Sequence, residues 1–190
     1  TLFLSKRSLP LEYVKSEFSI ISLLKNKISM SNIEFNTRSV LLDDFISFVR
    51  LTDNKPELFL LEKIVKQGNI VLNLRLNLDQ NGKVKNDYII NGLVKNGNFN
   101  LLNQGELEKI NFKFNLRKDD YTFNQINFRF KNIKFNSDKL KINKKKDIFL
   151  INGSVNNNQS SLDNSLLKLL NLNFKNLNVK DIKFKSKNNF

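Results

Sequence analysis

The chain of 190 residues contains no cysteine, no histidine and no tryptophan, and only two prolines and six glycines. Without cysteine it forms no disulfide and has no thiolate nucleophile. Without cysteine and histidine it also lacks the usual ligands of a zinc site. The lack of histidine removes the commonest general base. These absences exclude much of ordinary enzyme chemistry, so we expect a protein that is not an enzyme and uses neither a metal nor a cofactor.

Acidic residues are also scarce. The chain has 18 aspartates and glutamates against 32 lysines and arginines, so its formal net charge is +14. A strongly basic chain suggests a polyanionic partner, such as nucleic acid or an anionic membrane surface. However, asparagine makes up about a sixth of the residues, and lysine, isoleucine, leucine and phenylalanine are abundant. This composition is typical of AT-rich genomes, so we attribute part of the basic charge to genomic bias.

Long hydrophobic runs are missing too. No stretch reaches the ~18 uninterrupted apolar residues of a membrane-spanning helix, and no signal peptide is visible at the start. The first residue is threonine, so we expect an excised segment of a longer protein. Any membrane anchor is then expected outside these residues.

A clear period of two runs from Gly68 to Asp79. Every second residue is apolar, so a strand would carry one apolar stripe opposite polar side chains; the stripe is Ile70, Leu72, Leu74, Leu76 and Leu78. The segment Gln80–Lys83 contains an Asn-Gly pair that favours a tight hairpin turn, and the alternation resumes from Tyr88 to Val94. The pattern predicts an antiparallel meander with one apolar and one polar face.

The rest of the chain extends this mainly β fold class, an extended antiparallel meander that forms a curved sheet or groove. Two or three short amphipathic helices are expected: two at 39–51 and 57–67, the second ended by Gly68, and a possible third near 162–170. A hairpin is expected across 25–27 and a turn at 95–98, with further strands at 110–116, 121–130, 133–142 and 149–155. We therefore expect one continuous domain, with N-terminal strands in 1–38, two helices in 39–67 and the meander in 68–190.

Two weak internal repeats accompany the strands. Ile-x-Phe recurs from Ile33–Phe35 to Ile182–Phe184, and Ile90–Val94 is echoed by Ile151–Val155. Repeated strands with one apolar face indicate stacking of like units along an axis. In a chain rich in phenylalanine and isoleucine, chance explains such short repeats about equally well.

This organisation resembles the AsmA-like superfamily of Gram-negative envelope proteins, of the AsmA, TamB and YhdP type. The resemblance spans most of the chain: Ser22–Ile28 leads to Asn32–Phe35, then come helices, a long alternating strand, and Ile90–Gly97 before the meander. It implies a long twisted β-groove that is anchored in the inner membrane, crosses the periplasm and carries phospholipid toward the outer membrane. It implies no catalytic residues. The family's N-terminal membrane helix is not found in this sequence.

The apolar lining of such a groove is expected to bind lipid acyl chains, and a predicted strand of eleven residues, about 36 Å long, suits a deep groove. The mechanism would be passive, with about 0.8 kcal/mol gained per buried methylene. The lining is predicted to consist of Leu72, Leu74, Leu76, Ile90, Phe112, Phe114, Phe128 and Phe130.

Taken on the residues alone, a closed core is favoured, because most sheets with one apolar face pack against another layer. The main alternative is therefore a closed-core structural or adhesin-like β-domain without lipid binding. A nucleic-acid-binding module is less expected, because a stacking platform needs aromatic and basic side chains on the same face. Here phenylalanines alternate with charges along each strand. We thus expect phospholipid as the partner, other envelope proteins as a second class of partner, and no nucleic acid.

Overall fold

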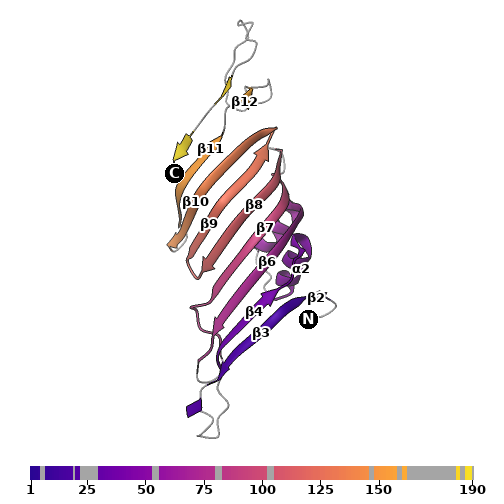
Figure 1. Ribbon diagram of the computed structural model, residues 1–190, viewed down its shortest axis with the longest axis vertical. Coiled ribbons are helices and arrows are strands. Elements are labelled where there is room, and N and C mark those ends of the chain that lie inside the picture. The colour runs from indigo at the N-terminus through magenta and orange to yellow at the C-terminus, as the bar shows by residue number, and fades with distance from the viewer. Residues whose placement is uncertain are drawn as a thin grey trace, which may run out of the picture.

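The computed structural model describes residues 1–4, 7–18, 20–21, 30–52, 56–79, 83–101, 105–145, 148–157, 160–161, 183–184 and 187–189. Within these residues the chain forms an open antiparallel sheet with two short helices on one of its faces (Figure 1). The architecture confirms the mainly β meander that the period of two predicts. The predicted hairpin loop at 25–27, the Asn-Gly turn at 80–82 and the helix at 162–170 lie outside the described residues.

Nine strands follow one another across the sheet in the order β14-β11-β10-β9-β8-β7-β6-β4-β3. Their bounds are β3 Leu11–Phe18, β4 Met30–Thr37, β6 Val65–Asn77, β7 Ile89–Asn100, β8 Glu106–Arg117, β9 Asp120–Phe130, β10 Ile133–Lys145, β11 Ile148–Asn157 and β14 Lys187–Asn189. The two-residue strand β5 (Val40–Leu41) pairs with β6 beyond the end of β4. Two small separate sheets join β1 (Leu2–Leu4) to β2 (Arg7–Leu9) and β12 (Ser160–Ser161) to β13 (Lys183–Phe184).

The register of the strands aligns side chains into two neighbouring rows of opposite character. The first, which we call the apolar row, takes one residue from each of β3, β4 and β6 to β11: Val14, Phe35, Leu74, Ile90, Leu116, Tyr121, Ile142 and Ile151. The second, the polar row, is Tyr13, Asn36, Asn73, Asn91, Asn115, Thr122, Lys141 and Asn152. Because successive residues of a strand point to opposite faces, the rows define an apolar face and a polar face of the sheet.

The echo between Ile90–Val94 and Ile151–Val155 has a structural counterpart. The isoleucines that open the two segments lie in the apolar row, and the asparagines that follow lie in the polar row. The third residue of each is a glycine on the apolar face. A Cβ atom on Gly92 would lie 2.2 Å from Cζ of Phe114, so the phenylalanine ring occupies the space of the missing side chain. The repeat marks equivalent positions in the sheet.

Helices α2 (Leu42–Thr52) and α3 (Pro56–Ile64) connect β5 to β6. Apolar residues recur in α2 at spacings of three and four, and three of them, Leu42, Ile46 and Phe48, are 5–7% exposed and pack in one core with side chains of β6, β7 and β8. Acidic residues in the first turn of α2 and Arg50 in its last turn suit the helix dipole. Helix α3 packs less closely, since Phe59 is 47% exposed. Helix α2 is therefore the element that covers the apolar face.

Two predicted boundaries are wrong for the same physical reason. Helix α3 ends at Ile64 and β6 begins at Val65, so Gly68 (φ +138°) lies inside the strand at an irregularity in its pairing with β7. The predicted turn at 95–98 is also part of a strand, because β7 continues to Asn100 with Asn96 at φ 52° beside a register shift. A positive φ serves a tight turn and a β-bulge equally well, and bulges increase the twist of long strands.

Thr37 is the last residue of β4. Its side chain bonds to β6 at Leu72, between the part of β6 that pairs with β4 and the part that pairs with β5. Its Oγ1 atom accepts a hydrogen bond from the backbone N–H of Leu72 at 3.0 Å, and the residue is 1% exposed. The substitution Thr37→Val keeps the shape but removes this acceptor, so we expect the free energy of unfolding to fall by about 1–3 kcal/mol in urea titrations. Thr122→Val on the polar face is the control, with an expected change within about 0.5 kcal/mol. Equal losses in both variants would contradict this role for Thr37.

Candidate functional site

The candidate site is the apolar face of the sheet. Beside the apolar row, the ring of Phe112 lies 6.0 Å from that of Phe114 and 5.7 Å from that of Phe123, measured between centroids. Near the other ends of the strands, Phe128 stacks on Phe135 with centroids 5.2 Å apart. The apolar face is thus a hydrophobic surface that extends across eight strands.

The predicted lining residues all lie on this face, but at two levels of exposure. Phe128 and Phe130 reach it because the positive φ of Gln125 (53°) interrupts the alternation of β9, so that Asn127 pairs with Asn111 of the polar face. Leu72 and Phe114 are 5% and 8% exposed and belong to the core next to α2. The other six are half-buried: Leu74, Leu76, Ile90, Phe112, Phe128 and Phe130. Of these six, Leu74, Ile90 and Phe112 still pack against that core, and Leu76 lies near α2 as well, so Phe128 and Phe130 are the lining residues that lie apart from α2.

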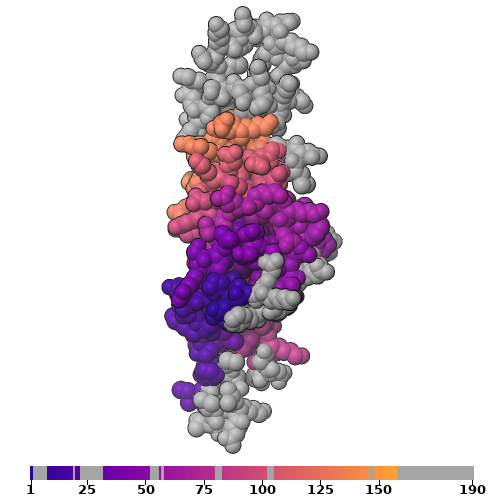
Figure 2. Space-filling model, turned by 90° about the vertical axis from the view of Figure 1, so that its right-hand side faces the viewer, coloured from indigo at the N-terminus to yellow at the C-terminus, as the bar shows by residue number. Residues whose placement is uncertain are grey.

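The sheet extends well past the helices. Helices α2 and α3 lie at the β6 and β7 part of the sheet, while β9 to β11 continue beyond them along the long axis of the molecule (Figures 1 and 2). Strand β11 exposes hydrophobic side chains on both faces: Phe149 (56%) and Ile151 (53%) on the apolar face, and Ile148 (64%) and Leu150 (48%) on the other. A large part of the apolar face thus extends beyond the cover of the described helices.

A cavity of about 350 Å³ lies between α2 and the sheet. Its walls include Phe45 and Val49 of α2, Leu74 and Leu76 of β6, and Leu11 of β3. Thr37 is the only polar residue in the part of the lining that the structure describes. Apolar cavities of about 150 Å³ stay dry and bind small apolar molecules. The larger cavity here has room for a hydrocarbon group, and none of the described side chains around it is charged.

No local sequence pattern predicts this cavity. The apolar character of Leu11, Phe45 and Val49 is visible in the chain, and the last two have helical spacing within the predicted helix at 39–51. The cavity, however, requires α2 to fold back over β4 and β6, which is a long-range contact that no local pattern specifies. Its residues could have been found only by knowing which strands pair.

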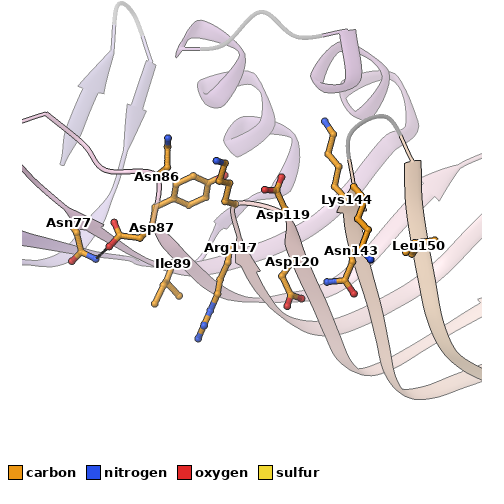
Figure 3. A pocket seen from close by; sticks show the side chains of 13 residues that line it. Asn77, Asn86, Asp87, Ile89, Arg117, Asp119, Asp120, Asn143, Lys144 and Leu150 are labelled. Carbon is orange, nitrogen blue, oxygen red and sulfur yellow. Dashed lines mark hydrogen bonds between the residues drawn. The ribbon is translucent and has the colours of Figure 1, made fainter.

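A second, shallower hollow of about 680 Å³ lies at the rim where β6, β8 and β10 end and β7, β9 and β11 begin (Figure 3). Its charged side chains have both signs: Asp87, Arg117, Lys118, Asp119, Asp120, Lys144 and Lys145. In Figure 3 Arg117 and Asp120 point away from the helices, whereas Lys144 points toward their side of the sheet. Lys144 pairs in register with Phe149, two positions beyond Ile142 of the apolar row. It therefore places a positive charge at the rim of the apolar face.

The polar face carries a hydrogen-bonded cluster around Glu34. Its Oε1 atom accepts hydrogen bonds from Asn73 Nδ2 at 2.6 Å and from the Tyr13 hydroxyl at 2.9 Å, and Arg75 Nη2 lies 3.5 Å from Oε2. The bond from Asn73, followed by that from Tyr13, lowers the pKa of Glu34 because both stabilise the carboxylate. The bond to Glu34 raises the pKa of Tyr13. The cluster joins β3, β4 and β6 on the face opposite the cavity.

This cluster predicts a pH dependence of stability. Because the pKa of Glu34 is lower in the folded chain than its ordinary value of 4.5, the carboxylate stabilises the fold above that pH. The contribution is lost as the pH falls through the folded-state pKa. We expect the urea midpoint of the wild type to drop more steeply on acidification than that of Glu34→Gln. The control Glu108→Gln, at an exposed position on β8, should retain the wild-type dependence. Identical acid sensitivity in Glu34→Gln and wild type would contradict the assignment.

No family model, curated protein or solved structure matches this chain. Within the described ranges, no helix is long and apolar enough to span a membrane. In the same part of the chain, histidine, cysteine, aspartate and glutamate side chains form no group of three or more that could hold a metal ion.

Proposed function

We propose that this chain binds lipid acyl chains along its apolar face. It would be a non-enzymatic segment of an AsmA-like periplasmic protein, anchored to the inner membrane by parts outside these residues, and would serve phospholipid transport to the outer membrane or assembly of that membrane. The observation that carries the proposal is the apolar row, in which eight strands contribute a hydrophobic side chain in register. The sequence resemblance supports the placement in the envelope.

An acyl chain suits the middle of this face better than a polypeptide does. A peptide laid on the apolar row would bring backbone amides that need hydrogen-bond partners, and hydrophobic side chains supply none. A hydrocarbon has no such requirement, and each methylene that it buries contributes about 0.8 kcal/mol. From β7 to β11 the row covers about 19 Å, since neighbouring strands lie ~4.8 Å apart. A long acyl chain can therefore make contact with several strands at once.

The rim offers a place for the headgroup. Lys144 is exposed, and its Nζ atom lies 5.6 Å from the centroid of the Phe149 ring. A carboxylate or phosphate at this position would pair with the ammonium group and remain in water, while its acyl chain lies on Phe149 and Ile142. The headgroup stays in water and the acyl chain on the sheet because burying a charge without a partner has a large unfavourable free energy.

Equilibrium binding of a fluorescent fatty acid tests the proposal. When cis-parinaric acid is titrated with the full chain, we expect a saturable rise in fluorescence. Unlabelled palmitate should displace it, whereas glycerol phosphate should not, because it has headgroup chemistry but no acyl chain. A folded chain that gives no saturable signal would refute the proposal.

A further inference from the structure

We infer that the cavity beneath α2 receives the methyl end of the bound acyl chain, so that the lipid lies across the strands with its headgroup near Lys144. This inference rests on the proposed function and adds to it a fixed orientation of the ligand. It assigns the cavity as the end of the binding site.

The cavity and the apolar row form one surface. Leu74 and Ile90 belong to both, and the next residue of the row, Leu116, lies directly opposite Ile90 in register. Ile90 and Leu116 also pack against the same hydrophobic core. A hydrocarbon can thus pass from the cavity onto the row over Leu74, Ile90 and Leu116, which are all apolar.

The two ends of this path differ in charge, and the difference fixes the orientation. Among the described residues that line the cavity end none is charged, and the hydroxyl oxygen of Thr37 there already accepts the hydrogen bond from Leu72. The opposite end has the ammonium group of Lys144 at the rim. A headgroup inside the cavity would be desolvated without a partner, whereas at Lys144 it is both hydrated and paired.

The wall formed by α2 is firmly attached. Leu42, Ile46 and Phe48 are buried in the core, and Phe48 also lines the cavity together with the half-buried Phe45 and Val49. Buried side chains thus anchor the helix, and Phe48 takes part in both the core and the cavity wall. The cavity wall therefore limits how far the end of the hydrocarbon can extend beneath α2.

Two photoactivatable fatty acids test the orientation on the full chain. One carries a diazirine at the terminal carbon and the other carries it next to the carboxyl group, and the labelled peptides are mapped by mass spectrometry. We expect the terminal label on α2 and β6, and the carboxyl-proximal label on β10 and β11. Saturable binding with a reversed or uniform distribution of label would overturn the inference and leave the proposed function standing. A folded chain without binding or labelling would overturn the proposed function itself.

A cavity-filling variant and a matched control sharpen this test. Val49→Phe adds bulk to the cavity wall, and Val84→Phe makes the same change where the side chain is 54% exposed. Val49→Phe should remove the terminal label from α2 and weaken binding of a long-chain fatty acid at least about fourfold, the change expected for one methylene lost from burial. Val84→Phe should change neither. If circular dichroism shows that Val49→Phe does not fold, Leu76→Phe fills the cavity from the sheet side. Wild-type labelling and affinity in the folded cavity variant would overturn the inference.

Discussion

Replacing Phe114 with alanine is expected to lower the free energy of unfolding by about 3–5 kcal/mol. The ring is 8% exposed and belongs to the core that joins α2 to β6, β7 and β8. It also covers Gly92, where a Cβ atom would lie 2.2 Å from Cζ of the ring. The substitution therefore opens a cavity at the centre of the core and uncovers the backbone of β7. Urea unfolding followed by circular dichroism measures the loss.

The control for this prediction is Phe149→Ala, which removes the same ring from a position that is 56% exposed. We expect a loss of less than about 1 kcal/mol there, because little contact area disappears. A second comparison uses Gly92→Ala, which should destabilise the wild type more than it destabilises Phe114→Ala, since the obstructing ring is gone in the latter. Equal losses for the two phenylalanine variants would contradict the assignment of Phe114 to the core.

The second large effect concerns binding. Ile142→Asp should weaken the affinity for cis-parinaric acid at least about thirtyfold, which corresponds to about 2 kcal/mol. Ile142 lies in the apolar row between Tyr121 and Ile151, so the carboxylate of an aspartate at this position would be desolvated by the bound acyl chain. The residue is half-buried and lies outside the core beneath α2, so we expect the variant to fold.

The matched control is Asn143→Asp, which adds the same charge at the next residue of β10. Asn143 points to the opposite face, so its substitution should change the affinity by no more than about twofold, through long-range electrostatics that salt screens. Similar losses in both variants would mean that net charge, and not the apolar face, determines binding.

Local sequence patterns predict the strands and faces of this protein well. The alternation from Ile70 to Leu76 predicts the two faces of β6. The spacings of three and four among Leu42, Phe45, Ile46, Phe48 and Val49 predict the apolar side of α2. Each pattern reflects the geometry of a single element, with a period of two for a strand and 3.6 for a helix. All residues that form one such pattern therefore lie within about ten positions of one another in the chain.

What the sequence does not reveal depends on pairing between distant residues. Gly68 is predicted to end a helix and Asn96 to lie in a turn, but both lie in β-bulges. Residues that favour a positive φ occur in turns, helix ends and bulges alike, so local sequence does not distinguish these structures. Leu72 of β6 and Phe114 of β8 are buried because they pack in one core with α2. Helix α2 lies directly after β5, far from both residues along the chain, so no local pattern shows this burial. The apolar row and the cavity are properties of the register, and a one-residue slip would place polar side chains in the row.

The central claim is that the apolar face beyond α2 is an open surface for lipid. Site-specific photocrosslinking in bacterial cells tests it most directly, with probe residues at Phe128 and Ile151 on the apolar face and at their neighbours Asn127 and Asn152 on the polar face. We predict lipid adducts at Phe128 and Ile151 and none at the two asparagine positions. Equal adducts at all four positions, or no lipid adduct at either position of the apolar face, would contradict the claim.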